Sequence, residues 1–383
     1  MFRPTFLTQV SSVAVDLPDW LNEKELQQII KNEFQTFQQI ENIQCRSQLN
    51  TQRLQIQIKL ADNSTRTVNY QIKSKELETL KFPRYQSFQV ELHMRKVVLP
   101  AMENLYKNVQ KNITFTLSSY PTKNGLLLED LQAKGYRLAS QPRGLDQAAM
   151  EVALSKLAAY HAASTCYLQI NPNQLDELLP SKEPGEDIQQ LKVWLQRKFH
   201  ESLRANGLQH YEDKVKAYQR ILASHVETHD PRKSFNVILN GTCWANNLLG
   251  HFDAFGQLKD VVFNDFAGAR LGPAVHDLLL LLLTAPAAKT DQFDGFLRHY
   301  VDELTVNLKL LKFKGKFPTL TDIQLDLLSS GHWAFQTVTE ILPIVLADLG
   351  CEDIDEMFKL TQYSVEIQKL LPWLENRGYF EVD

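Results

Sequence analysis

Residues 236–284 constrain the fold of this chain more than any other stretch. The stretch holds three short β-type runs that bracket polar loops and one apolar run that follows them, at 237–239, 248–249, 261–263 and 278–283. A strand–loop–strand arrangement that leads into a buried helix commonly presents polar groups at a cleft. Asn247 and Asp265, beside these runs, are therefore the first candidates for functional side chains.

Length and charge narrow the class of protein. With 383 residues, of which 44% are apolar, the chain is long enough for a large core and for about two domains or lobes. The formal net charge is -4, the pI is near 6.2, and no long block of one sign occurs. These values argue against nucleic acid or an anionic membrane as the main partner and favour a small molecule.

Targeting signals and paired cysteines are not visible in the sequence. Residues 1–16 lack the continuous apolar core of a secretion signal, and the apolar run at 278–283 is far below the roughly 20 residues that a bilayer requires. The four cysteines are scattered without CxxC spacing, so we expect neither a disulfide framework nor a zinc site. The expected location is the reducing cytoplasm.

Periodicity predicts a small mixed region followed by a helical one. Asp19 is expected to cap a helix whose apolar stripe reaches Phe34 and Phe37, and alternating apolar residues at 54–60 and 68–72 predict two antiparallel strands. Helical spacing over residues 88–100 predicts another helix, limited by its final proline. The boundary of the small mixed region is expected near Asp130. Beyond it, helices are expected at 150–163, 188–203, 211–226, 293–311, 322–342 (stopped or kinked at Pro343) and 353–371.

Several ordered motifs resemble those of a known family. They are Cys243-Trp-Ala-Asn-Asn247, Asn264-Asp-Phe266 and Gly272-Pro-Ala-Val-His-Asp-Leu278, supported by Glu129-Asp-Leu131 and by residues 157–164 and 88–100. Together they resemble the ecdysteroid-kinase-like and choline-kinase-like small-molecule kinases of insects, which are relatives of aminoglycoside phosphotransferases. The resemblance covers nearly the whole chain. It implies an α+β, two-lobed protein-kinase-like fold, with a small lobe at 1–131 and a mainly helical lobe at 132–383.

The resemblance also implies ATP and Mg²⁺ as cofactors, with roles for particular residues. Lys73 matches the strand lysine that contacts the nucleotide phosphates, and Glu91 matches the helix glutamate that orients it. Asn247 and Asp265 match the two magnesium ligands, and both offer the oxygen atoms that a hard cation requires. The remaining match is the adenine-contacting linker between the lobes, at Glu129 to Leu131.

Two departures from the family pattern concern catalysis. Family members usually carry His-Gly-Asp where this chain has Asn240-Gly241-Thr242, so Thr242 replaces the aspartate that would accept the proton of the substrate hydroxyl. The segment at 45–50, expected to cover the phosphates, contains no glycine, although glycine lets backbone amides approach phosphate closely. Both departures bear on whether nucleotide is bound and transferred.

Two functions remain open at this stage. The first is an ATP-dependent O-phosphotransferase acting on a small alcohol or a steroid-like acceptor such as an ecdysteroid, with impaired catalysis. The second is a pseudokinase that serves as a non-catalytic binding or regulatory protein. A thiol hydrolase built on Cys243 and His276 is a third, weaker hypothesis, since the sequence identifies no oxyanion donors. We expect His161 and Asp277 to have structural roles.

Overall fold

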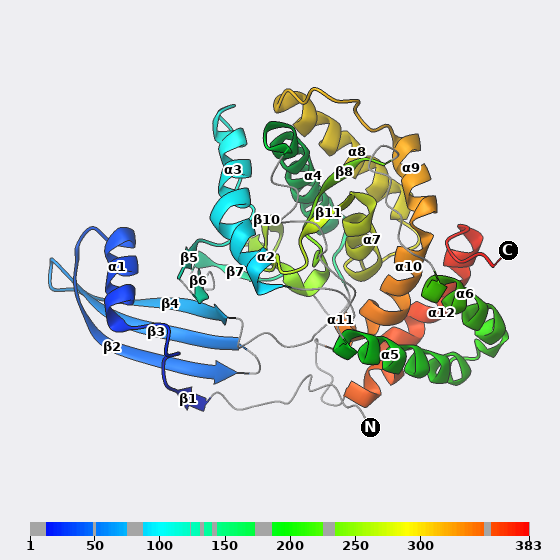
Figure 1. The fold of residues 1–383 in the computed structure, drawn as a ribbon, viewed down its shortest axis with the longest axis horizontal. Coiled ribbons are helices and arrows are strands. Elements are labelled where there is room, and N and C mark those ends of the chain that lie inside the picture. The colour runs from blue at the N-terminus through cyan, green and yellow to red at the C-terminus, as the bar shows by residue number, and fades with distance from the viewer. Residues whose placement is uncertain are drawn as a thin grey trace. The chain divides into compact units, whose positions relative to one another are not determined.

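The computed structural model describes residues 13–48, 51–74, 87–122, 124–130, 134–139, 144–172, 186–224, 234–347 and 354–382. These residues divide into a smaller unit within 7–79 and 116–135 and a larger unit within 80–115 and 136–383 (Figure 1). The organisation is α+β, with a sheet-rich N-terminal region and a helical C-terminal part, which confirms the predicted fold class. Leu131 lies outside the described residues.

The smaller unit is an antiparallel sheet in the order β1-β2-β3-β4-β6-β5 with one helix. The strands are β1 Val13–Val15, β2 Phe37–Gln48, β3 Thr51–Leu60, β4 Thr65–Ser74, β5 Ser119–Pro121 and β6 Gly125–Glu129, and the helix is α1 Glu23–Glu33. The alternating residues of β3 and β4 pack in one core with Leu26 and Ile30 of α1. Alternation therefore predicted β3 and β4 correctly.

The start and end of α1 differ from the prediction. The N-cap is Asn22, whose side chain accepts a hydrogen bond from Glu25 N while the Glu25 carboxylate accepts one from Asn22 N. This reciprocal pair satisfies two backbone donors at once, which a cap at Asp19 would not do. The helix ends at Glu33, and Phe37 opens strand β2.

The larger unit begins with a continuous helical segment made of α2 Phe88–His93, the π-helical turn η2 Met94–Val98 and α3 Leu99–Lys107. Pro100 does not end this helix, contrary to expectation. The wider π turn precedes Leu99-Pro100, and a second π turn, η7 Thr337–Ile341, precedes Leu342-Pro343 in the same way. A π turn shifts the local hydrogen-bond register, which lets a proline without an N–H stand in a continuing helix.

The sequence-based boundary differs from the compact units in this helical segment. Residues 88–107 fall within 1–131 in the sequence, yet 80–115 belongs to the larger unit. Tyr106 on α3 is fully buried, and its hydroxyl donates to the Ala159 carbonyl on α4 or to Asn307 Oδ1 on α8, each 2.9 Å away. The contacts of α3 with these two helices therefore place it in the larger unit.

Helices α4 and α8 lie side by side in the larger unit (Figure 1). Helix α7 is buried along its whole length. The helices are α4 Gln147–Ile170, α5 Glu186–Ala205, η5 Gln209–Tyr211, α6 Glu212–Ser224, α7 Val275–Thr284, α8 Phe293–Leu310, α9 Leu320–Ser329, α10 Gly331–Gln336, α11 Leu342–Ala347, η8 Ile354–Lys359 and α12 Thr361–Asn376. None of the helices in the described part of the chain is long and apolar enough to cross a membrane.

Two small antiparallel sheets carry the polar loops of residues 236–284. The first sheet has the order β10-β9-β7, and the second pairs β11 with β8. Their strands are β7 Tyr136–Leu138, β8 Asn236–Leu239, β9 Leu248–Phe252, β10 Leu258–Phe263 and β11 Arg270–Pro273, with the short turn η6 Ala245–Asn247 before β9. Both β8 and β10 pack on the long helix α4, so the loops at their ends rest on a buried support.

Candidate functional site

The turn at Asn240–Thr242 follows strand β8 and requires glycine at its centre. Gly241 has a φ of 74°, in the left-handed region that side-chain-bearing residues rarely adopt. A Cβ atom at this position would lie 1.9 Å from the carbonyl oxygen of Gly268. The turn therefore lies directly against the segment that follows Asp265.

Asp277 on α7 binds the backbone of this turn through hydrogen bonds. Its carboxylate accepts the backbone N–H of Asn240 at 2.6 Å through Oδ2 and that of Gly241 at 2.9 Å through Oδ1. The side chain is fully buried, and no bulk water competes for these hydrogen bonds. The structural role expected for Asp277 is therefore confirmed, and the loop that it braces is the Asn240–Thr242 turn.

His161 and Tyr300 complete the buried network around Asp277. His161 Nε2 lies 3.2 Å from Asp277 Oδ2, and His161 Nδ1 lies 2.7 Å from the Tyr300 hydroxyl. Burial, and secondarily the charge of Asp277, holds the pKa of Tyr300 well above its usual value, so the hydroxyl keeps its proton. Both ring nitrogens of His161 therefore have a buried polar partner. His161 is thus a core histidine, as predicted.

Thr242 has a buried side chain whose hydroxyl is engaged within the site. The hydroxyl lies 2.9 Å from the Asp265 carbonyl oxygen and 3.2 Å from Asn240 Oδ1, and both atoms are acceptors. Asn240 Nδ2 donates to the same Asp265 carbonyl at 2.8 Å. Both residues are fully buried. The turn therefore fixes the backbone at Asp265, and its threonine proton is directed toward protein acceptors.

Asn247 and Asp265 lie at the same end of one strand pair. Phe263, the last residue of β10, pairs with Leu248, the first residue of β9, and Asn264 N donates to the Asn247 carbonyl at 2.9 Å. Asn247 precedes Leu248 and Asp265 follows Asn264, so the hairpin brings the two predicted metal ligands to one edge. The structure thus places together the pair that the sequence singled out.

Hydrogen bonds orient both of these side chains. Asn247 Nδ2 donates to the Thr242 carbonyl at 3.0 Å, which leaves the amide oxygen as the atom that could bind a cation. Asp265 Oδ1 accepts the backbone N–H of Ala267 at 2.7 Å. A side chain whose rotamer is fixed loses less entropy when it binds a metal ion. The local geometry is therefore compatible with metal binding.

Glu91 on α2 is buried beside Arg95, a residue that the sequence analysis did not assign to the site. Arg95 Nε donates to Glu91 Oε1 at 2.9 Å, and Arg95 Nη2 donates to the Asn264 carbonyl oxygen at 2.8 Å. The two side chains are one helical turn apart and have exposed fractions of 0% for Arg95 and 3% for Glu91. Glu91 and Arg95 are four residues apart on the predicted helix, and this spacing was the sequence signal that could have predicted their ion pair.

Lys73 and Glu129 lie in the smaller unit on neighbouring strands. Lys73 on β4 is the register partner of Leu126 on β6, and Glu129 is the partner of Tyr70. The Glu129 amide donates to the Ser118 carbonyl at 2.9 Å, and its carboxylate forms an ion pair with Lys134. The Glu129 amide is therefore engaged within the sheet.

Cys243 does not fit a nucleophile. Its side chain is fully buried, and burial together with the negative charge of Asp277 raises the pKa of its thiol well above the usual value. A catalytic cysteine requires the opposite shift, since the thiolate is the nucleophile. The ring of His276 packs on Trp333, with 4.2 Å between the ring centres. These contacts argue against the thiol-hydrolase hypothesis.

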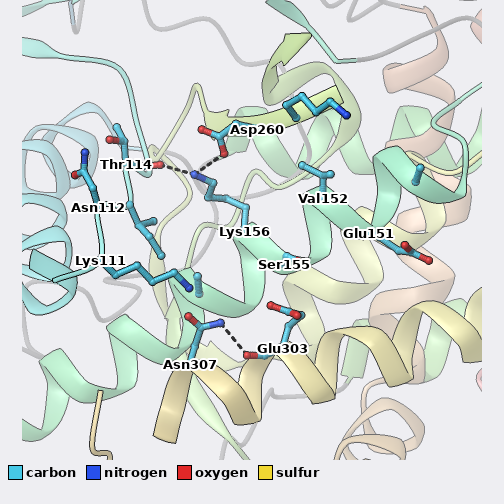
Figure 2. Close-up of a pocket in the computed structure, with 14 residues that line it drawn as sticks. Lys111, Asn112, Thr114, Glu151, Val152, Ser155, Lys156, Asp260, Glu303 and Asn307 are labelled. Carbon is cyan, nitrogen blue, oxygen red and sulfur yellow. Dashed lines mark hydrogen bonds and ion pairs between the residues drawn. The ribbon is translucent and has the colours of Figure 1, made fainter. Parts of the chain in front are cut away.

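A pocket of about 600 Å³ lies against the N-terminal half of α4 (Figure 2). Lys156 on its wall is almost fully buried and donates to the Thr114 carbonyl at 2.8 Å, and it forms an ion pair of the same length with Asp260. Asp260 is near the start of β10, whereas Asp265 follows the end of that strand. The pocket therefore contains none of the predicted site residues.

Comparison with known proteins assigns the chain to a class and then to a family. The model of the ecdysteroid kinase-like family matches residues 49–313, well over half of the 383 residues. The class is the kinase-like one that this family description names. The chain belongs to the ecdysteroid kinase-like family. A search of curated proteins found no match.

Solved kinase structures show a weaker likeness. An amicoumacin kinase in complex with AMP-PNP, Ca²⁺ and Ami is 12% identical over 93% of this chain and 95% of its own, with a TM-score of 0.36. An aminoglycoside phosphotransferase from Streptomyces rimosus in complex with ADP and streptomycin is 14% identical over 67% of this chain and 90% of its own, with a TM-score of 0.26. At these scores the likenesses support no inference about this chain.

Proposed function

We propose that this chain is an ATP-dependent O-phosphotransferase for a small alcohol or a steroid-like acceptor, with impaired catalysis. The observation that carries the proposal is a contrast within residues 236–284, between the pair Asn247 and Asp265 and the turn Asn240–Thr242. Asn247 and Asp265 stand together with oriented oxygen donors, whereas Thr242 is buried and hydrogen-bonded to the Asp265 carbonyl. The pair Asn247 and Asp265 suits a metal–nucleotide complex, whereas the Asn240–Thr242 turn lacks a proton acceptor.

The donor set fits Mg²⁺ held jointly with a nucleotide. In the described part of the chain, no three His, Cys, Asp or Glu side chains gather as a self-sufficient metal site. Magnesium commonly takes only one or two protein oxygens and completes its shell with phosphates and water. Asn247 and Asp265 would supply those protein oxygens. The bound ion would neutralise charge on the phosphates, which is its main contribution to phosphoryl transfer.

Roles for four further residues follow from family membership as proposals. Lys73 would contact the phosphates, and Glu91 would contribute to orienting the site. Glu129 and Leu131 would form the adenine-contacting linker. Because the Glu129 amide already donates to Ser118, its contact with adenine would use the carbonyl oxygen.

The replacement at position 242 sets the expected size of the catalytic defect. A positioned general base contributes about 10² to 10⁴ in rate. The Thr242 hydroxyl is not a base near neutral pH, and here its proton faces protein acceptors. In a loose transition state, positioning and charge neutralisation provide much of the remaining acceleration. Slow transfer is therefore the expected activity.

A pseudokinase with a binding or regulatory role is the second candidate. It is favoured by the full burial of Asn240 and Thr242, whose side chains form a closed set of hydrogen bonds with each other and with Asp265. Such a turn would hold a nucleotide site in shape without performing chemistry. The free thiols at Cys45, Cys166 and Cys243 support the proposal of a cytoplasmic protein for either function.

A thermal-shift titration tests the nucleotide site, because a ligand that binds only the native state raises its stability with concentration. We expect millimolar ATP with Mg²⁺ to raise the melting temperature, and ATP with a chelator to raise it less. Asp265→Asn should abolish the metal-dependent part. Asp253→Asn, at the opposite end of the same hairpin, is the matched control and should respond like the wild type. A wild type that Mg·ATP does not stabilise would contradict the proposal.

A further inference from the structure

Arg95 joins the helical segment 88–107 to the residues on both sides of Asp265. Its guanidinium donates to the carbonyl oxygen of Asn264, the residue immediately before Asp265. The same guanidinium lies 5.5 Å from the ring centre of Phe266, the residue immediately after it. This distance is within the range of cation–π contacts. The guanidinium thus contacts the chain before and after the proposed metal ligand.

Glu91 provides the charge that makes this arrangement stable. A buried guanidinium without a partner is strongly unfavourable, and its planar fork lets it serve two acceptors in different directions. One direction is taken by Glu91 on the same helix and another by the Asn264 carbonyl. The carboxylate therefore fixes the guanidinium in the orientation that reaches Asn264.

Asp265 is consequently held by contacts from two directions. Arg95 fixes the backbone at Asn264, while Asn240 and Thr242 both donate to the carbonyl oxygen of Asp265 itself. The rotamer of the Asp265 side chain depends on the same segment, because Oδ1 accepts from the amide of Ala267. Loss of the Arg95 contact would release one of these two constraints.

We propose that Arg95 is a positioning residue that couples the helical segment 88–107 to the metal-binding Asp265, with Glu91 as its counter-ion. The inference rests on the proposed function, because Asp265 must bind the metal–nucleotide complex for the coupling to affect activity. Glu91 then acts on the metal site through Arg95. A displacement of the helix would shift the Asp265 segment through a direct hydrogen bond.

Arg95→Lys is the informative substitution. It keeps a positive charge beside Glu91, but one ammonium nitrogen cannot reproduce the planar fork that serves both Glu91 and the Asn264 carbonyl. Lys96→Arg, the reverse change at the exposed neighbouring position, is the matched control. Arg95→Met combined with Glu91→Gln removes both charges and provides a second variant if the first does not fold.

Calorimetric titration with ATP, in Mg²⁺ and separately in chelator, measures the effect on the metal site. Loss of an outer-shell contact typically weakens metal affinity about 10- to 100-fold. We therefore expect Arg95→Lys to lose that much of the Mg²⁺-dependent gain in ATP affinity while its affinity for metal-free ATP stays unchanged. Equal losses with and without metal, or no loss in a folded variant, would overturn the proposal.

Amide hydrogen exchange in the absence of nucleotide separates this proposal from the proposed function. The Ala267 amide reports on Asp265 directly, and the Ile323 amide in the first turn of α9, bonded to the carbonyl of the N-cap Thr319, reports on a separate element of the same unit. We expect Arg95→Lys to accelerate exchange at Ala267 and to leave Ile323 unchanged. Unchanged exchange at Ala267, or equal acceleration at both amides, would refute the positioning role even if the wild type binds no nucleotide.

Discussion

Asp277→Asn is predicted to destabilise the larger unit strongly although it changes only one atom. The wild-type carboxylate accepts hydrogen bonds from Asn240 N, Gly241 N and His161 Nε2 at 2.6, 2.9 and 3.2 Å. An asparagine keeps one acceptor oxygen and turns an NH₂ group toward at least one buried N–H donor. A buried unsatisfied polar group costs about 1–3 kcal/mol, and loss of the charge on a buried acceptor adds to this. The expected loss of unfolding free energy is about 2–5 kcal/mol.

Equilibrium unfolding in urea, followed by circular dichroism, measures this difference. Asp302→Asn is the control, because it makes the same chemical change at an exposed position on α8 and should leave the unfolding free energy unaltered. Asp277→Asn should also weaken Mg·ATP binding, since the Asn240–Thr242 turn that holds the Asp265 carbonyl would lose its support. A change of less than about 0.5 kcal/mol, the size usual for a surface substitution, would refute the reasoning about the buried network.

Three further predictions concern other parts of the larger unit. Gly241→Ala, which combines a φ of 74° with a Cβ atom 1.9 Å from the Gly268 carbonyl oxygen, should lower the melting temperature and weaken Mg·ATP binding; a normal variant in both assays would contradict the close approach. The hydrogen bonds from Arg377 lower the pKa of Asp294, so this pair should stabilise the fold above the unfolded pKa of about 3.9 and lose its effect as pH falls through the folded value. The difference in urea unfolding free energy between wild type and Asp294→Asn should therefore shrink in acid. A difference that grows in acid would contradict the predicted pH dependence. Because burial raises the pKa of the Cys243 thiol, iodoacetamide followed by mass spectrometry should label it only after denaturation, and rapid labelling of the native protein would contradict its burial.

Local periodicity predicted those elements whose side chains alternate without interruption. β3 and β4 pair in unbroken register over eight positions, so apolar residues recur at every second position on the core face. β2 was missed because its register with β3 shifts between Phe37 and Gln39 and again between Ile40 and Asn42. Each irregularity changes which residues face the core, and this hides the strand from an alternation count.

The two prolines illustrate a different limit of local rules. Pro100 was expected to limit its helix and Pro343 to stop or kink its helix, but helix continues past both prolines, each of which follows a π turn that leaves room for the missing N–H. Nothing in the residues Met94–Val98 or Thr337–Ile341 marks a π turn by composition. The hydrogen-bond register depends on packing around the helix, which a propensity rule does not contain.

The sequence indicated which residues belong to the candidate site, but not the long-range hydrogen bonds that hold them. Motif order located Asn247 and Asp265, and the β9–β10 hairpin brings them together. The brace from Asp277 to Asn240 spans 37 residues, and the contact from Arg95 to Asn264 spans 169. Such hydrogen bonds depend on the folded arrangement, so no spacing rule in one sequence reveals them.

The rate at which the double variant Asn240→His/Thr242→Asp transfers the γ-phosphoryl group of Mg·ATP to water, measured as ADP and inorganic phosphate formed, tests the central claim most directly. If the metal-binding half of the site is intact and only the base is missing, the variant should form ADP faster than the wild type, by up to about 10² to 10⁴. Adding Asp265→Asn to the same variant should remove the gain. A double variant that binds Mg·ATP as tightly as the wild type and gains no rate would contradict the account.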